Sequence, residues 1–142
     1  MTEKPNDTDR RIGQIARIYC TQVLPLRTRS VPLLGRKCRA RIFFSFLGYE
    51  VKMGRKRVTC PDNVTARYLK IFAELGLKEV EIPYDPTRTA ALLPVLERAY
   101  EEMNRLLDES ELARPKRLAA ARAAYRRLRR RLADCGPEDD LD

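Results

Sequence analysis

The stretch from Arg36 to Cys60 constrains the fold more than any other part of the sequence, and it reads RKCRARIFFSFLGYEVKMGRKRVTC. Apolar and polar residues alternate in three short runs, and glycines lie where the runs meet. Alternation with a period of two is typical of strands that bury one face, and glycine at the first central position suits a two-residue type II′ turn. The stretch therefore predicts a three-stranded antiparallel meander, with Gly54-Arg55 as its second turn.

The same alternation sorts the side chains of the meander onto two faces. The inward set would form one wall of the core and consists of Ile42, Phe44, Phe46, Val51, Met53, Val58 and Cys60. The outward set combines cations with an aromatic ring and consists of Arg39, Arg41, Phe43, Lys52, Arg57 and Thr59. Gly48 permits a tight turn or a bulge, which leaves the side taken by Tyr49 open.

The segments around the meander predict an α+β fold, in the order N-terminal helix, three-stranded antiparallel meander, helix, fourth strand and two C-terminal helices. Apolar residues recur at a spacing of three to four, which marks helices at about 9–24, 63–75, 87–109 and 116–133. Residues 78–84 alternate, and we expect this fourth strand beside the meander in one mixed sheet. Residues 25–35 contain two prolines and a glycine, which predicts an irregular connector.

We expect one domain with short appendages, because 142 residues match the size of an ordinary domain. The predicted parts are a disordered N-terminus over 1–8, the α+β domain over 9–110, a basic C-terminal helix packed on it over 111–133, and an acidic disordered tail over 134–142. The N-terminus has no apolar signal segment, and no apolar run approaches the ~18 residues that a membrane span needs. We therefore expect a cytoplasmic protein that does not bind membranes.

The net charge of +9 is unevenly distributed, since residues 112–133 hold nine lysines and arginines and no acid. Arginine outnumbers lysine 22 to 7. Arginine is suited to bidentate contacts with phosphate and to stacking on bases, so this bias favours a nucleic acid as partner. A GC-rich genome would raise the arginine content without any selection for binding, and that alternative stays open.

Three cationic features are candidates for a nucleic-acid site: the outward face of the meander, its second turn, and the C-terminal helix. The candidate binding residues are Arg39, Arg41, Phe43, Tyr49, Lys52, Arg55, Lys56, Arg57, Arg122, Arg126 and Arg130. Each feature has an alternative explanation. A helix could cover the outward face, the turn could be merely solvated, and the C-terminal helix could dock on the acidic helix at 89–109.

Enzyme and metal chemistry find little support in the sequence. There is no histidine, which is the commonest general base, and no GxxxxGK[ST], GxGxxG or GxSxG motif. The spacings of Cys20, Cys38, Cys60 and Cys135 do not resemble a zinc site, so we expect buried free thiols, no metal and no cofactor. Cationic neighbours could lower the pKa of the Cys38 and Cys60 thiols. Asp62 and Asp85 lie where strands lead into helices, and helix capping is the simpler explanation for these two carboxylates.

The order helix, three-stranded meander, helix resembles that of double-stranded-RNA-binding domains. That family carries a lysine-rich motif at the start of its second helix. Here the corresponding stretch, DNVTAR at 62–67, holds one cation, and a further strand follows. The resemblance therefore extends to the element order alone.

The sequence supports a non-catalytic nucleic-acid-binding protein, with RNA favoured over DNA, that uses the outward sheet face and the hairpin turn. The alternative is an assembly factor whose two C-terminal helices pair with a second copy or with an acidic protein. A small enzyme of unrecognised type is the third hypothesis. The outward sheet face discriminates between the first two, because an open face favours nucleic acid and a face covered by the C-terminal helices favours assembly.

Overall fold

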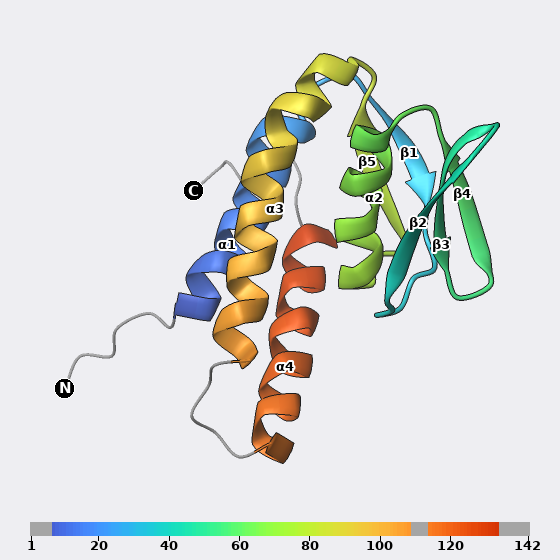
Figure 1. Ribbon diagram of the computed structural model, residues 1–142. Helices are drawn as coiled ribbons and strands as arrows, with labels where there is room; N and C mark the ends of the chain where they lie inside the picture. Colours follow the sequence, from blue (N-terminus) through green and yellow to red (C-terminus); the bar gives the residue numbers. More distant parts are fainter. Residues whose placement is uncertain (1–6, 109–113, 134–142) are drawn as a thin grey trace.

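The computed structural model describes residues 7–108 and 114–133 (Figure 1). Its elements confirm the predicted α+β fold and, with one further strand, the predicted order. The elements are α1 (Asp7–Ile18), a π-helical turn η1 (Tyr19–Val23), β1 (Thr28–Pro32), β2 (Ala40–Ser45), β3 (Gly48–Met53), β4 (Lys56–Cys60), α2 (Asn63–Leu75), β5 (Glu79–Pro83), α3 (Pro86–Asp108) and α4 (Arg114–Ala133). Predictions for residues 1–6, the 109–113 segment and the acidic tail fall outside the described residues.

Helix α2 lies at the centre of the molecule, between the meander on one side and the other helices on the other (Figure 1). It begins at a cap in which the Thr65 backbone N–H donates to Asp62 Oδ1 at 2.7 Å. It ends at Gly76, whose φ of 91° is the left-handed geometry of a glycine cap. Because both its flanks are covered, α2 contributes the largest buried side chains of the core, Tyr68 and Phe72.

Strands β2, β3 and β4 form the predicted meander, with strand order β2-β3-β4 and antiparallel pairing throughout. Met53 lies opposite Lys56, so the second turn consists of Gly54 and Arg55, as predicted. Gly54 has a φ of 59°, and no described residue other than glycine has a positive φ, which is the pattern of a type II′ turn.

The prediction of an irregular connector over 25–35 is wrong at its centre. Strand β1 lies there and pairs antiparallel with β5, from Thr28 opposite Pro83 to Pro32 opposite Glu79. Pro32 and Pro83 sit at strand ends, so they do not interrupt the pairing. The local signals for a loop were therefore overridden by pairing with a strand about 50 residues away.

The prediction that the fourth strand joins the meander is also wrong, because β5 and β1 form a separate two-stranded sheet. Two buried tyrosines hold the backbone of β5. The Glu81 N–H donates to the Tyr19 hydroxyl at 2.9 Å, and the Tyr68 hydroxyl donates to the Glu81 carbonyl at 2.7 Å. Side-chain partners thus satisfy the hydrogen-bonding groups that a third strand would otherwise use.

The predicted core wall of the meander is correct for Val51, Met53 and Cys60, which are buried. It is wrong for Phe44 and Phe46, whose exposed fractions are 76% and 97%. Phe44 does lie on the inner side, where it contacts Tyr49, but Figure 1 shows the β2–β3 hairpin projecting past the helices, so no helix of the described residues covers it. Phe46 lies in the turn rather than in a strand, since Ser45 pairs directly with Gly48.

Helix α4 packs against α1, and also contacts α3 and α2. Its buried stripe consists of Ala124, Tyr125, Leu128 and Leu132. The Tyr125 hydroxyl donates to Asn104 Oδ1 on α3, which joins the two C-terminal helices. The apolar seam of α4 is therefore used within the molecule, on α1 as well as on the acidic helix α3.

Candidate nucleic-acid interface

The outer face of the meander, defined by Arg41, Phe43, Glu50, Lys52, Arg57 and Thr59, points away from α2. The pairing places these side chains in two cross-strand rows. Arg41 lies opposite Lys52, which lies opposite Arg57, and the next row is Phe43, Glu50 and Thr59. The described helix that packs against all three strands is α2, on their inner face (Figure 1). The outer face is thus open within the described part of the chain.

Electrostatics set the first row apart. Three cations stand directly opposite one another, an arrangement that destabilises a sheet because like charges repel across strands. Arg57 is partly compensated by Glu50, with Nη1 and Oε1 3.7 Å apart. Within the described residues, Arg41 and Lys52 have no carboxylate at salt-bridge distance. An anionic ligand would relieve the repulsion in this row.

Several predicted residues lie at the margins of this face. Arg39 is exposed just before β2, and Arg55 is exposed in the second turn. Lys56 pairs with Met53 and so belongs to an inner-face row. Tyr49, whose side the sequence leaves open, lies opposite Cys60 and Phe44 on the inner side, so its predicted place beside the outer cations is wrong.

The arginines predicted on the C-terminal helix, Arg122, Arg126 and Arg130, are all exposed on α4. They do not join the outer face, because α2 lies between α4 and the meander (Figure 1). The two groups of predicted binding residues are therefore separate surfaces.

The connector at 36–39 runs between these two surfaces, and the sequence predicted a binding role only for Arg39 within it. The Lys37 ammonium lies 4.3 Å from the centre of the Tyr125 ring on α4, a cation–π contact. Both Lys37 and Arg129 crowd the end of α2, since a Cβ on Gly76 would lie 2.8 Å from Lys37 N and 2.7 Å from Arg129 Nη1. The Arg129 guanidinium there also interacts favourably with the negative end of the α2 dipole. In the sequence, the basic run RKCR directly before β2 was the signal that could have indicated a role for this connector.

The cysteines do not provide an activated nucleophile among the described residues. Burial raises the pKa of the Cys60 thiol to about 11, and burial with the nearby Glu74 raises the pKa of Cys38. The expectation that cationic neighbours lower these pKa values is therefore wrong, because desolvation outweighs them. Cys38 and Cys60 are free thiols as predicted, whereas Cys20 is disulfide-bonded, so the free-thiol prediction is wrong at that position.

The carboxylates at the strand-to-helix junctions act as caps. Asp62 caps α2, and Asp85 Oδ1 accepts from both the backbone N–H and the hydroxyl of Thr87, at 3.0 and 2.7 Å. These two hydrogen bonds lower the pKa of Asp85. Within the described residues, no group of three or more histidine, cysteine, aspartate or glutamate side chains is placed to hold a metal ion.

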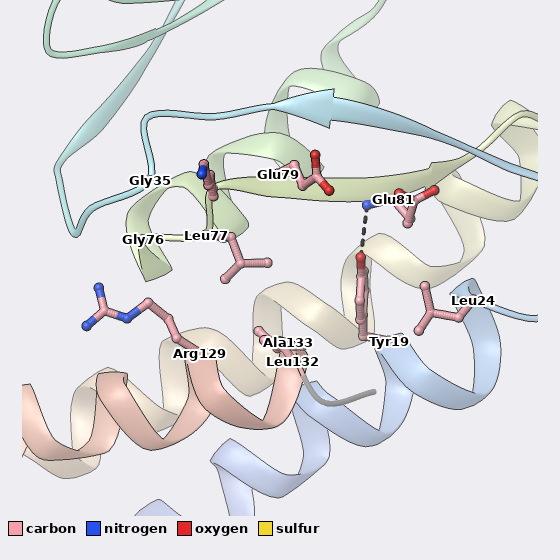
Figure 2. Close-up of a pocket in the computed structure, with 11 residues that line it drawn as sticks. Tyr19, Leu24, Gly35, Gly76, Leu77, Glu79, Glu81, Arg129, Leu132 and Ala133 are labelled. Carbon is pink, nitrogen blue, oxygen red and sulfur yellow. Dashed lines mark hydrogen bonds between the residues drawn. The ribbon is translucent and has the colours of Figure 1, made fainter. Parts of the chain in front are cut away.

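A cavity of about 500 Å³ lies elsewhere, between η1, the end of α2, β5 and α4 (Figure 2). Tyr19, Glu79, Glu81 and Arg129 line it together with apolar residues such as Leu77 and Leu132. Figure 2 shows the Tyr19 hydroxyl directed at the backbone of Glu81, so this polar group is already bound. Opposite charges line the cavity together, which gives it no preference for an anion.

None of the helices in the described ranges is long and apolar enough to cross a membrane. Comparisons with protein-family models, with curated proteins and with solved structures found no significant match.

Proposed function

We propose that this protein binds nucleic acid without catalysing a reaction, and that the outer face of the meander is the binding surface. The observation that carries the proposal is the open cross-strand row Arg41–Lys52–Arg57, beside the exposed ring of Phe43. A protein that needed this sheet only for stability would gain by placing opposite charges in that row. Three aligned cations are better explained by a polyanionic ligand.

The residues of this surface have distinct parts in the proposal. Arg41 and Lys52 contact phosphates, because they lack carboxylate partners within the described residues. Arg57 contributes less, since Glu50 offsets part of its charge. Arg39 and Arg55 extend the positive surface to the ends of the sheet. Phe43 offers a flat face to an unpaired base, and unpaired bases are the usual targets of sequence-reading RNA-binding sheets, which favours RNA.

The arginine stripe Arg122, Arg126 and Arg130 is a second, independent contact in this proposal. It lies on the other side of α2, and the connector at 36–39, whose Lys37 contacts Tyr125 of α4, lies between the two surfaces. A cytoplasmic location, where RNA is accessible, is part of the proposal.

The competing role in assembly receives less support from the arrangement of the helices. An outer face covered by the C-terminal helices would have favoured that role. Instead, α3 and α4 pack on α1 and α2. The seam of α4 is buried, and the large side chains exposed among the described residues of that helix are lysine and arginine.

The test compares two double variants of equal net charge. Arg41→Gln with Lys52→Gln removes the two uncompensated cations of the row. Arg88→Gln with Arg98→Gln removes two exposed cations of α3, outside the proposed site. We expect the first variant to bind single-stranded RNA more weakly and to reduce the slope of log K against log salt by about 1.4, at ~0.7 for each lost phosphate contact. Equal effects from both variants would show that binding follows net charge rather than this site.

A further inference from the structure

The turn of the β2–β3 hairpin exposes large apolar side chains that the fold does not use. This apolar tip consists of Phe44, Phe46 and Leu47, with exposed fractions of 76%, 97% and 68%. Phe43, on the outer face beside it, is 45% exposed. Figure 1 shows the tip at the edge of the molecule, away from every helix. Gathered apolar side chains of this size on a protein surface mark an interaction site.

The geometry of the turn does not require the apolar side chains of the tip. Phe46 and Leu47 occupy the two turn positions, where glycine, asparagine, aspartate and proline are the residues that favour turning. The turn is instead supported from outside those positions, because the Leu47 N–H donates to Ser45 Oγ at 3.3 Å and Gly48 takes a φ of 117°. Polar residues could therefore replace Phe46 and Leu47 without loss of the hairpin.

One ring of the tip is held in place. Phe44 packs edge-on against Tyr49, with ring centres 5.1 Å apart and planes at 64°. Such a contact orients the Phe44 ring on the inner side of the hairpin, next to the turn that carries Phe46. Tyr49, predicted as a binding residue on the outer face, thus belongs to the support of the tip.

The spacing along the hairpin fits a polymer in which charged and flat groups alternate. Residues two apart on a strand lie roughly 7 Å apart, so Phe43 lies about that far from the Arg41–Lys52–Arg57 row, and the tip lies about 15 Å from it. A single strand that runs along the outer face meets the cations first, then Phe43 and then the tip. A flat membrane that meets the tip end-on would not also reach Phe43 and the row, because these lie on the side of the hairpin.

We infer that the ligand of this surface is a single-stranded nucleic acid whose unpaired bases stack on Phe43 and on Phe46 of the apolar tip. This inference rests on the proposed function and specifies its ligand. In a duplex, bases present only their edges in the grooves, whereas unpaired bases expose the faces that aromatic side chains bind. The cations of the row hold the backbone, and the rings at 43 and 46 hold the bases.

The test uses three substitutions of Phe46, which is almost fully exposed, so that each variant should keep the fold. Phe46→Ala removes the ring, Phe46→Leu keeps an apolar side chain without a flat face, and Phe46→Trp keeps a flat face. Binding is measured with a short single-stranded RNA and with the same sequence as a duplex. We expect Phe46→Ala and Phe46→Leu to weaken single-strand binding by about 10-fold or more, the effect of one lost base stack, and to leave duplex binding unchanged.

Phe46→Trp provides a direct signal, because the chain contains no other tryptophan. We expect this variant to bind as the wild type does, and its fluorescence to be quenched by the single-stranded RNA as a base stacks on the indole. When Phe46→Trp is combined with the outer-face changes Arg41→Gln and Lys52→Gln, the fluorescence should still be quenched once enough RNA is added to saturate the protein.

The outcomes separate this inference from the proposed function. If the wild type binds single strands and Phe46→Ala binds equally well, the inference is overturned while the proposed function stands. The inference is also overturned if Phe46→Leu binds single strands as tightly as the wild type, or if the Phe46 variants lose affinity for the duplex in parallel. It is overturned as well if Phe46→Ala abolishes a dimer or binding to phosphatidylserine vesicles instead. If the wild type binds neither form at low salt, the proposed function itself is wrong.

Discussion

Replacing Lys52 with glutamine should stabilise the protein and weaken its binding to RNA. Lys52 stands between Arg41 and Arg57, so its charge meets two like charges across the strands. Each such pair costs about 0.2–1 kcal/mol, and the nearby Glu50 offsets part of this cost, which leaves a gain of about 0.5–1 kcal/mol for Lys52→Gln. Glutamine keeps most of the side-chain length, so the change tests charge more than packing.

Urea unfolding at low salt measures this gain. A protein of this size unfolds with a slope of ~2 kcal/mol/M, so the midpoint should rise by about 0.3 M. In 1 M NaCl the Debye length falls to about 3 Å, and the difference between Lys52→Gln and the wild type should vanish. A variant that is less stable at low salt, or whose gain persists in 1 M NaCl, would refute the idea that repulsion in this row is a cost kept for binding.

Glu50→Gln gives the opposite result by the same reasoning. It removes the carboxylate that compensates Arg57, so the protein should become less stable and bind RNA more tightly. Glu101→Gln, at an exposed position on α3, is the matched control and should change neither property. A parallel fall in stability and affinity for Glu50→Gln would contradict the account.

Three further predictions concern the fold. Tyr68→Phe leaves the Glu81 carbonyl without its 2.7 Å hydrogen bond in the core, and should lower the free energy of unfolding by about 1–3 kcal/mol, measured with urea. Gly48→Ala should also destabilise, since its Cβ would lie 2.8 Å from the Cys60 carbonyl oxygen at a φ of 117°; the expected loss is about 1–3 kcal/mol, and an unchanged melting temperature would contradict it. The pKa of Cys60 rises from 9.0 to about 11 on folding, so its stabilising contribution is complete below pH 9 and is lost as the pH rises towards 11. Cys60→Val should therefore lose less stability than the wild type over that interval, as followed by urea unfolding at each pH.

Local signals predicted the meander and the ends of α2 correctly because the physical causes are local. The turn at Gly54 needs a positive φ, and the cap at Asp62 needs a side-chain oxygen beside free N–H groups. Partners distant in sequence decided what local signals could not. Strand β1 exists because β5 pairs with it, and β5 stays apart from the meander because tyrosine hydroxyls from η1 and α2 bind Glu81.

From the sequence, the candidate site could be predicted only where apolar and polar residues alternate along the strands. Alternation placed Arg41, Phe43 and Lys52 together on one face, as the register shows. It also assigned Phe44 to the inner side correctly, but it cannot say how far α2 extends over that side. The exposure of Phe44 is therefore a property of the packing of whole elements, and the apolar tip could be found only from the structure.

The central claim is that the outer face binds nucleic acid through several phosphates, and the salt dependence of wild-type binding to a single-stranded RNA tests it most directly. The account predicts a linear fall of log K with log salt, with a slope of about −1.4 or steeper for at least two phosphate contacts. It also predicts that affinity is highest at low salt. Binding that does not change between low and high salt, or no binding at the lowest salt, would contradict the claim.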